Sequence, residues 1–262
     1  MLDFKCQVKA LESLTQYASD RRHSIIIEGC SGSGKTELAK TYASMLGVSD
    51  FSVVDSKVND IKDAFYGIAS IDNDIVVAIE NLDSGVSACS YALLKAMEEP
   101  SDNLYIVVTC SDVRKIPDTV KSRCVTATIA YPSSSDLDRY AEKYYEASFK
   151  AIRRKSLWRC ARSFADVDLL CGMNDEEISY VSKWSNLSRF TSSVNSIGWK
   201  LWHYDNGSEA PYSLIVRYIM YSNKEDMHCV RSCIDCLNDL DSKRIAPYMA
   251  LLRLSFELKY CE

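Results

Sequence analysis

Hydrophobic residues in the first half of the chain form short continuous runs, which are separated by stretches with helical spacing. The runs are rich in Val and Ile and predict buried strands at Ser24–Glu28, Phe51–Asp55, Asp74–Glu80, Leu104–Cys110 and Val125–Ile129. The helical spacing predicts helices at Phe4–Ala18, Lys35–Leu46, Val58–Ala69, Ser87–Glu98 and Pro117–Ser122. Buried strands that alternate with helices are typical of a parallel sheet with helices on both faces.

After Tyr131-Pro132 the strand-like runs end, and helical spacing continues from Ser135 to about Leu201. A polar Asp-Asn-Gly-Ser stretch at residues 205–208 reads as a linker. Three further helices are predicted beyond it, at Tyr212–Tyr221, Lys224–Leu237 and Lys243–Tyr260. We therefore predict an α/β domain over residues 1–131, a small helical domain over 132–204 and a helical bundle over 205–262.

A phosphate-binding loop is predicted between the first strand and the helix that follows it. Its residues match the pattern G-x-x-x-x-G-K-[ST] and are Gly29, Cys30, Ser31, Gly32, Ser33, Gly34, Lys35 and Thr36. Glycines let successive backbone N–H groups point into one concavity, and the loop opens a helix N-terminus that favours anions. Lys35 is expected to reach the β- and γ-phosphates of ATP, and Thr36 to offer its hydroxyl to Mg²⁺. The alternative is a loop that keeps this shape without a ligand.

The third predicted strand ends in acid, as the magnesium-binding strand of a P-loop protein does. Glu80 closes this apolar strand and is the expected second Mg²⁺ ligand. The next residue is Asn81, whose amide has no useful basicity near neutral pH. Asn81 therefore cannot serve as a general base for hydrolysis.

Composition narrows the class of protein only slightly. The chain has 262 residues, of which 47 % are hydrophobic and 26 % charged. No apolar run approaches the roughly 18 residues of a membrane span, and the acidic start lacks a signal-peptide pattern. We therefore expect a cytoplasmic protein without a membrane partner. The net charge of −5 excludes nucleic-acid coating by bulk charge, although a local basic surface stays open.

The chain has eleven cysteines, which a cytoplasmic protein keeps as reduced thiols. The densest group is Cys229, Cys233 and Cys236. Their spacing puts them along one face of a single helix, where ligands do not easily surround a metal tetrahedrally. Core packing is the expectation for this group, and metal binding is the alternative.

Three further segments carry a resemblance to a known family. They are the helix Ala92–Pro100 (ALLKAMEEP), the polar residue Ser111 after the fourth strand, and Ser122-Arg123-Cys124. With the P-loop, they resemble AAA+ sliding-clamp loader subunits, the bacterial DNA polymerase III γ and δ′ group and its phage and eukaryotic relatives. The resemblance covers residues 20–130 well. It implies an α/β P-loop NTPase (AAA+) domain, a helical lid domain and a short collar-like helical bundle for oligomerisation.

The resemblance also implies roles for single residues. Arg123 would be an arginine finger that acts in trans on a neighbouring subunit; a structural cap before the fifth strand is the alternative. Ser111, or failing it Thr109, would be the sensor 1 residue near the γ-phosphate. Arg189 would be the sensor 2 arginine that contacts the nucleotide in cis; a surface arginine is the equal alternative.

The function implied is that of an ATP-binding clamp-loader subunit in DNA replication. Its partners would be other loader subunits in a hetero- or homo-oligomer, pentameric in this family, a sliding clamp, and primer–template DNA contacted without sequence preference. Because Asn81 replaces the usual glutamate, hydrolysis is slow, depends on another group, or is absent. The second hypothesis is therefore a non-hydrolysing, δ′-like scaffold that supplies Arg123 to a partner. A different AAA+ replication switch, such as a helicase loader, is the third.

Overall fold

The computed structural model describes residues 4–56, 61, 73–84, 87–98, 101–173, 178–179, 190, 212–242 and 247–259. The chain divides into two compact units, each treated by itself below. The first comprises residues 1–138 with 163–165, and the second comprises residues 139–162 with 166–262. The division into three domains at 131 and 204 stays a prediction.

The first unit is built on a five-stranded sheet, ordered β2-β3-β4-β1-β5, in which every neighbouring pair is parallel. Its strands are β1 (Ser24–Glu28), β2 (Asp50–Asp55), β3 (Ile75–Glu80), β4 (Leu104–Cys110) and β5 (Val125–Thr128). The predicted parallel sheet is thus confirmed, and strand ends differ from the prediction by at most one residue.

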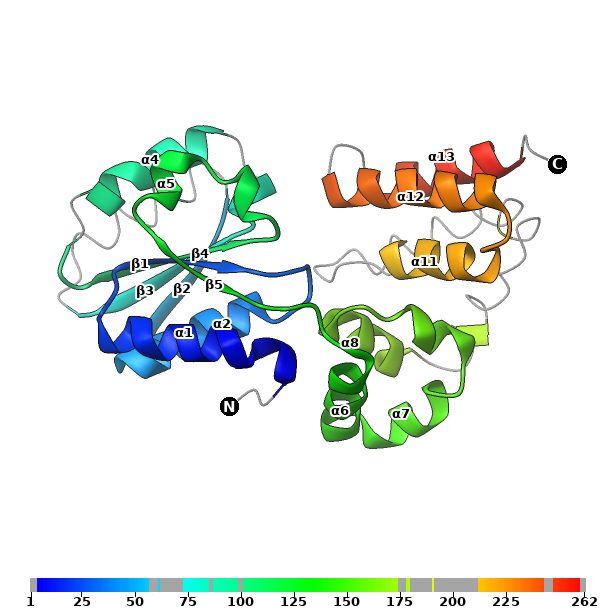
Figure 1. The fold of residues 1–262 in the computed structure, drawn as a ribbon, viewed down its shortest axis with the longest axis horizontal. Coiled ribbons are helices and arrows are strands. Elements are labelled where there is room, and N and C mark those ends of the chain that lie inside the picture. The colour runs from blue at the N-terminus through cyan, green and yellow to red at the C-terminus, as the bar shows by residue number, and fades with distance from the viewer. Residues whose placement is uncertain are drawn as a thin grey trace. The chain divides into compact units, whose positions relative to one another are not determined.

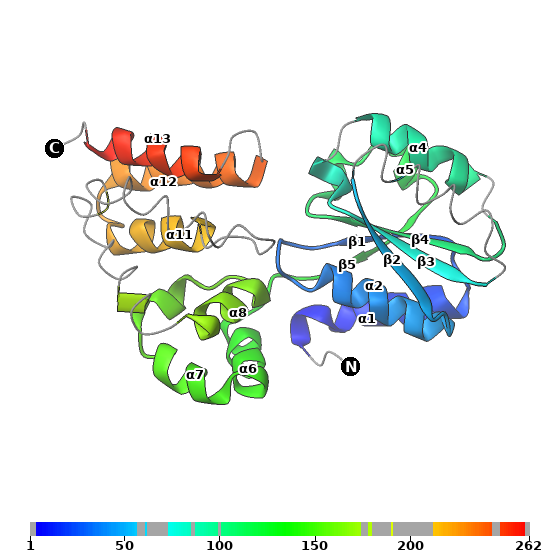
Figure 2. The same ribbon diagram turned by 180° about the vertical axis from the view of Figure 1, so that it is seen from behind.

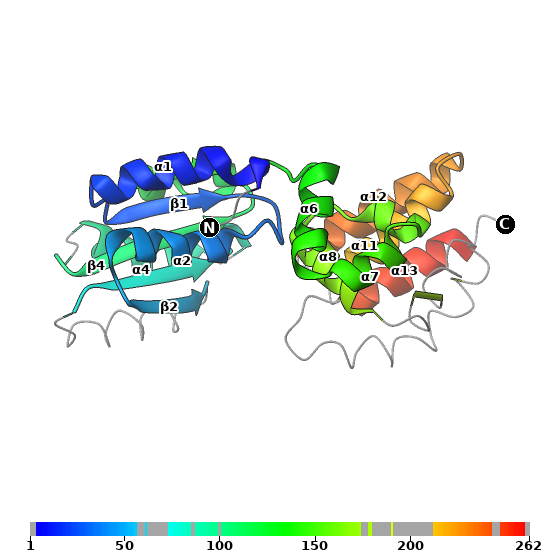
Figure 3. The same ribbon diagram turned by 90° about the horizontal axis from the view of Figure 1, so that it is seen from below.

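Helices cover both faces of this sheet (Figures 1 and 3). On one face lie α1 (Val8–Ser19), which follows a short 3₁₀ turn at Lys5–Gln7, and α2 (Lys35–Leu46). On the other lie α4 (Ser87–Glu98) and α5 (Asp118–Lys121). The central strands are buried on both sides, which is why their sequences are continuous apolar runs. The predicted helix Val58–Ala69 lies outside the described residues except for Ile61, which is buried.

The second unit is helical among its described residues (Figure 2). Its elements are α6 (Ser134–Tyr144), whose first turn belongs to the first unit, α7 (Glu146–Ile152), a 3₁₀ turn at Ser156–Cys160, α8 (Phe164–Gly172), α11 (Tyr212–Ser222), α12 (Met227–Ser242) and α13 (Pro247–Lys259). No described helix has both the length and the hydropathy that a membrane span requires.

One of these helices begins later than the sequence predicts. The Asp226 carboxylate accepts hydrogen bonds from the backbone N–H groups of His228 and Cys229 at 3.0 and 3.1 Å, so α12 begins at Met227 and not at Lys224. An aspartate in this position satisfies N–H groups that the helix itself leaves unpaired. The described part of α13 is Pro247–Lys259, and the predicted start of this helix at Lys243 lies outside the described residues.

The cysteines of α12 lie in the core of the helical unit. Cys229, Cys233 and Cys236 are at most 4 % exposed, and the Cys236 thiol points to the carbonyl oxygen of Ala250 on α13 at 3.5 Å. Burial raises the pKa of the Cys236 thiol to about 12 and keeps it neutral. The expectation of core packing is confirmed for all three.

A buried ion pair joins α8 to α11, and we predict that breaking it destabilises the helical unit. Arg217 donates to Asp166 at 2.6 Å, and the second Asp166 oxygen accepts from the backbone of Arg162 at 2.7 Å. Arg217→Ala would leave a carboxylate with only 9 % side-chain exposure, at a cost of about 3 kcal/mol in unfolding free energy. Urea denaturation followed by circular dichroism measures it.

The matched control is Arg253→Ala, which removes a half-exposed arginine from its pairs with Asp239 and Glu257. Such pairs contribute about 1 kcal/mol or less. Replacing Arg217 and Asp166 together by apolar residues should recover most of the loss. Equal effects of Arg217→Ala and Arg253→Ala would contradict the prediction.

Candidate nucleotide-binding site

The loop between β1 and α2 needs glycine at two positions for its path. Gly32 and Gly34 have φ angles of +69° and +90°, which side-chain-bearing residues rarely adopt. A Cβ atom at Gly34 would also lie 2.9 Å from the Gln7 amide nitrogen. The loop therefore has the tight turn that exposes backbone N–H groups at the start of α2. Ser31 is exposed in this loop, whereas Ser33 is buried.

Lys35 and Thr36 follow the loop on the first turn of α2. The Lys35 ammonium is buried and donates to the carbonyl oxygens of Gly29 and Cys30 at 2.9 and 3.1 Å. The Thr36 hydroxyl donates to the Glu80 carboxylate at the end of β3, with 2.5 Å between the oxygens. The two oxygen atoms that are expected to coordinate Mg²⁺ are thus in direct contact. A hydroxyl and a carboxylate are the kinds of ligand that Mg²⁺ prefers.

Buried polar atoms beside the loop support its fit to a polar ligand. Gln7 is 1 % exposed and donates through Nε2 to the carbonyl oxygen of Ser33 at 3.0 Å. Within the described part of the chain, the side-chain oxygen (Oε1) of Gln7 and the hydroxyl of Ser33 have no hydrogen-bond partner. Leaving a buried polar atom unpaired costs about 1–3 kcal/mol, so a pair of them against a phosphate-binding loop is unusual outside a functional site. The residues present fit a nucleoside triphosphate with a divalent cation.

The ends of β3 and β4 bring the predicted sensor residues to the same edge as the loop. Glu28 is in register with Cys110, so Ser111 follows beside Gly29. Ser111 is exposed, and its backbone N–H donates to Asp83 at 3.0 Å. Thr109 is buried, and its hydroxyl accepts from the backbone N–H of Asn81 at 3.1 Å. The sensor role of Ser111, with Thr109 as its alternative, stays a prediction.

The sheet register reveals a carboxylate that the sequence analysis missed. Asp55, the last residue of β2, is paired with Glu80 across the β2–β3 ladder. Side chains of paired residues in a parallel sheet point to the same face, about 4.8 Å apart at the backbone. Phe51 on the same side of β2 packs into the layer under α1 and α2. Asp55 and Glu80 therefore lie together on the face that carries Thr36.

The segment Ser163–Ala165 lies against the tip of the loop. Backbone N–H groups of Phe164 and Ala165 donate to the carbonyl oxygen of Gly32 at 3.0 and 3.4 Å. A Cβ atom at Gly32 would meet the Ala165 Cβ at 2.6 Å. The sequence analysis missed this contact, although Ser163 with Asp166 three residues later matches a helix-start signature. Arg189, the predicted sensor 2 residue, lies outside the described residues.

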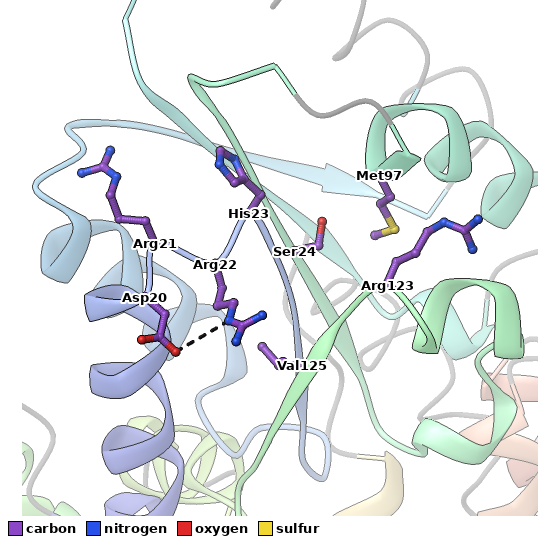
Figure 4. Close-up of a pocket in the computed structure, with 8 residues that line it drawn as sticks. All are labelled: Asp20, Arg21, Arg22, His23, Ser24, Met97, Arg123 and Val125. Atoms are coloured by element: carbon purple, nitrogen blue, oxygen red, sulfur yellow. Dashed lines mark ion pairs between the residues drawn. The ribbon is translucent and has the colours of Figure 1, made fainter.

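Arg123 lies at the opposite edge of the sheet from the loop. It precedes β5, whose Val125 is in register with Ile25, whereas Gly29 follows the far end of β1. Its guanidinium donates to Glu98 on α4 at 2.6 Å and to the carbonyl oxygen of Thr119 at 2.7 Å. The contact that is expected if Arg123 is a structural cap before the fifth strand is therefore present. Figure 4 shows Arg123 among the residues that line an open pocket at this edge of the sheet.

Three comparisons relate this chain to subunits of DNA polymerase III. A model described as the delta subunit of DNA polymerase III matches residues 49–133. The DNA polymerase III subunit gamma of Buchnera aphidicola is 26 % identical, over 44 % of this chain and 40 % of that protein. This chain thus matches two fifths of the length of that curated relative. A DNA polymerase III, gamma subunit-related protein from Thermotoga maritima shares the fold, with a TM-score of 0.58, 13 % identity, and coverage of 95 % of this chain and 99 % of that one.

The strand order, the P-loop after β1 and the acid at the end of β3 define a P-loop protein of the AAA+ class. Within that class, the matched segment contains Ser111 and Ser122-Arg123-Cys124, two of the segments that carried the resemblance. Together the comparisons support a clamp-loader-like AAA+ protein. The predicted family resemblance and fold class are confirmed.

Proposed function

We propose that this chain is an ATP-binding subunit of a multi-subunit clamp loader, which places a sliding clamp on primer–template DNA during replication. The observation that carries the proposal is the contact between Thr36 and Glu80 beside a P-loop of the required conformation. The loop would hold the phosphates of ATP. Thr36 and Glu80 would hold Mg²⁺, which neutralises charge on the phosphates.

The chain's own residues have defined tasks in this scheme. Lys35 exchanges its bonds to Gly29 and Cys30 for bonds to the β- and γ-phosphates, which keeps its buried charge compensated. Ser111 contacts the γ-phosphate or the attacking water from the adjacent strand end. Arg189 serves as the sensor 2 arginine. DNA is held through its phosphates by a few basic residues and backbone amides, so that binding depends on salt and not on sequence.

Arg123 supplies charge to the nucleotide of a neighbouring subunit. The length of β1 separates it from its own loop, and five residues of strand span roughly 16 Å. A guanidinium stays charged and bridges two phosphate oxygens, so it stabilises charge as the γ-phosphate leaves. The loader therefore requires an assembly of subunits, of this chain or of this chain with relatives.

The second candidate function is a scaffold subunit that binds ATP without turnover, and Asn81 favours it. The backbone of Asn81 has φ of +51°, a left-handed conformation that asparagine tolerates better than most residues. In the sequence, Asn81 occupies the position at which the family's usual glutamate would polarise water. Asp55 is paired with Glu80 across the β2–β3 ladder. Its carboxylate would polarise water in place of the side chain at position 81.

We predict that Asn81→Glu raises ATP turnover about tenfold or more, because it restores a base next to the magnesium ligand. The left-handed backbone should cost the variant about 1 kcal/mol of stability. Steady-state phosphate release measures the rate. Asn81→Gln is the matched control, since it has the same length and backbone strain but no basic group. Equal rates for both variants would contradict the missing-base argument.

The experiment that tests the proposed function is nucleotide binding followed by turnover. The full chain is titrated with a fluorescent ATP analogue and Mg²⁺, and turnover is then measured with and without primed DNA and clamp, at two salt concentrations. Turnover stimulated by DNA and clamp supports the loader. Binding without turnover under all conditions selects the scaffold, and absence of binding overturns both.

A further inference from the structure

Strands β3 and β4 are neighbours in the sheet (Figure 1), and a carboxylate joins the segments that follow them. Asp83 lies in the 3₁₀ turn Leu82–Ser84, just after β3. One of its oxygens, Oδ2, accepts hydrogen bonds from the backbone N–H groups of Ser111 and Asp112 at 3.0 and 3.1 Å. Hydrogen bonds to an ionised carboxylate are roughly twice as strong as those between neutral groups. Asp83 therefore fixes the path of the chain after β4.

Strand pairing does not extend to Ser111, because the last residue of β4 that pairs in the sheet is Cys110. The chain after it is tied to carboxylates instead. The backbone N–H of Val113 donates to Glu28 at 3.0 Å, just as that of Ser111 donates to Asp83. A segment beyond the end of a strand is otherwise among the more mobile parts of a protein. The position of Ser111 therefore depends on these two carboxylates, and Asp83 is the one that binds Ser111 itself.

Asp83 also links this segment to the expected magnesium ligand. It lies three residues after Glu80 in the chain. Between the two, the backbone N–H of Asn81 donates to the Thr109 hydroxyl at 3.1 Å, so the turn after β3 and the end of β4 exchange hydrogen bonds in both directions. Misplacing a group by about 1 Å can reduce the rate of an enzyme about 100-fold. A contact that sets the spacing between Glu80 and Ser111 therefore matters for a ligand that both of them reach.

We propose that Asp83 is a positioning residue, which holds Ser111 where its hydroxyl donates to the γ-phosphate of bound ATP. The inference rests on the proposed function and adds to it a residue that touches neither the nucleotide nor Mg²⁺. Because Asp83 acts on the γ-phosphate only through Ser111, the preference of the chain for ATP over ADP depends on it. A carboxylate that only stabilised the loop would leave this preference unchanged.

The first test measures the affinities of the full chain for ADP and for a non-hydrolysable ATP analogue, both with Mg²⁺, by calorimetric titration. Ser111→Ala should weaken binding of the analogue about tenfold, as expected for the loss of one hydrogen bond to a charged phosphate. Asp83→Ala should weaken it by a similar factor, and both variants should bind ADP within twofold of the wild type. Because the two changes remove one contact, the double variant should also lose about tenfold and not about 100-fold. Equal losses for ADP and the analogue, or losses that multiply in the double variant, overturn the assignment.

Two further variants separate this role from a general effect of charge. Asp83→Asn keeps an acceptor oxygen without the charge, so it should lose less affinity for the analogue than Asp83→Ala. Asp118→Ala is the matched control, since Asp118 is an exposed aspartate on α5 that pairs with Lys121 at 2.7 Å. It should leave both affinities within twofold of the wild type. A loss of the preference for the analogue in Asp118→Ala as large as in Asp83→Ala overturns the assignment.

Amide hydrogen exchange, followed by NMR, tests the contact itself without any nucleotide. In Asp83→Ala the N–H groups of Ser111 and Asp112 should exchange about tenfold faster or more, whereas that of Val113, which Glu28 holds, should change less. Unchanged exchange at Ser111 overturns the inference. A wild-type chain that binds neither nucleotide overturns the proposed function, whereas one that binds ADP and the analogue equally well overturns only the role of Asp83.

Discussion

Replacement of Lys35 by alanine is expected to weaken ATP binding by about 100-fold or more. The ammonium is 8 % exposed and donates to two loop carbonyls, so its charge sits inside the loop before any ligand arrives. Hydrogen bonds that involve a charged group contribute about 1.5–3 kcal/mol each, and losing two of them to phosphate oxygens gives an effect of this size. Titration with a fluorescent ATP analogue in the presence of Mg²⁺ measures it.

Lys40→Ala is the matched control for this experiment. Lys40 lies on the same helix, α2, but its ammonium is exposed and pairs with Glu37 at 2.7 Å. Its removal should leave the affinity within twofold. Thermal unfolding of both variants checks that Lys35→Ala still folds, because that change removes the hydrogen bonds that the Lys35 ammonium donates to the carbonyl oxygens of Gly29 and Cys30. Retained affinity in a folded Lys35→Ala chain would mean that ATP does not bind at this loop.

The features predicted correctly from the sequence are those that depend on residues close together along the chain. The strands β1, β3 and β4 are continuous apolar runs in the sequence because both of their faces are buried. Such strands do not alternate between apolar and polar residues, so their extent can be predicted directly from the apolar run. The loop from Gly29 to Thr36 is specified by its own glycines. The P-loop pattern and the acidic end of the third strand predicted that Thr36 and Glu80 share Mg²⁺, and the structure places the two oxygens together.

The contacts missed from the sequence all depend on register or on distant segments. Asp55 stands beside Glu80 only because β2 pairs with β3, and nothing in the spacing of the two residues fixes that register. Glu98 and Arg123 belong to two different motifs, and their ion pair is visible only once α4 and α5 pack on one face. Gln7 looks like an ordinary helix-start residue in the sequence. Its burial under the P-loop is a result of tertiary packing.

The contact of Glu98 with Arg123 bears on how a neighbour's nucleotide would engage the finger. The Arg123 guanidinium donates hydrogen bonds to the Glu98 carboxylate and to the carbonyl oxygen of Thr119, and the side chain is 34 % exposed. An exposed pair of this kind contributes about 1 kcal/mol or less, so phosphate oxygens can displace Glu98 at small cost. The capping role and the trans role of Arg123 are therefore compatible, and the bond to Thr119 would orient the side chain for the neighbour.

Arg123→Ala is accordingly expected to lower turnover at the P-loop of the adjacent subunit by about 1,000-fold, while its own P-loop binds ATP normally. Arginine fingers in P-loop enzymes contribute about 10³–10⁵ in rate, because they stabilise charge that develops only as the γ-phosphate leaves. The experiment mixes Arg123→Ala chains with Lys35→Ala chains, neither of which should turn over alone. The Arg123→Ala chains retain an intact P-loop and the Lys35→Ala chains retain the finger, so the mixture should recover activity.

Two variants separate this trans role from a purely structural one. Arg114→Ala removes an exposed arginine that pairs with Asp112 at 2.9 Å in the loop after β4, and it should leave turnover unchanged. Arg123→Lys keeps the charge but not the fork, so it should recover stability fully and turnover only in part. If Arg123 were a cap alone, Arg123→Ala would shift the unfolding midpoint, and its mixture with Lys35→Ala chains would be no more active than either chain separately. Activity that depends on Arg123 within the same chain would instead place the guanidinium at its own P-loop, which the length of β1 between them argues against.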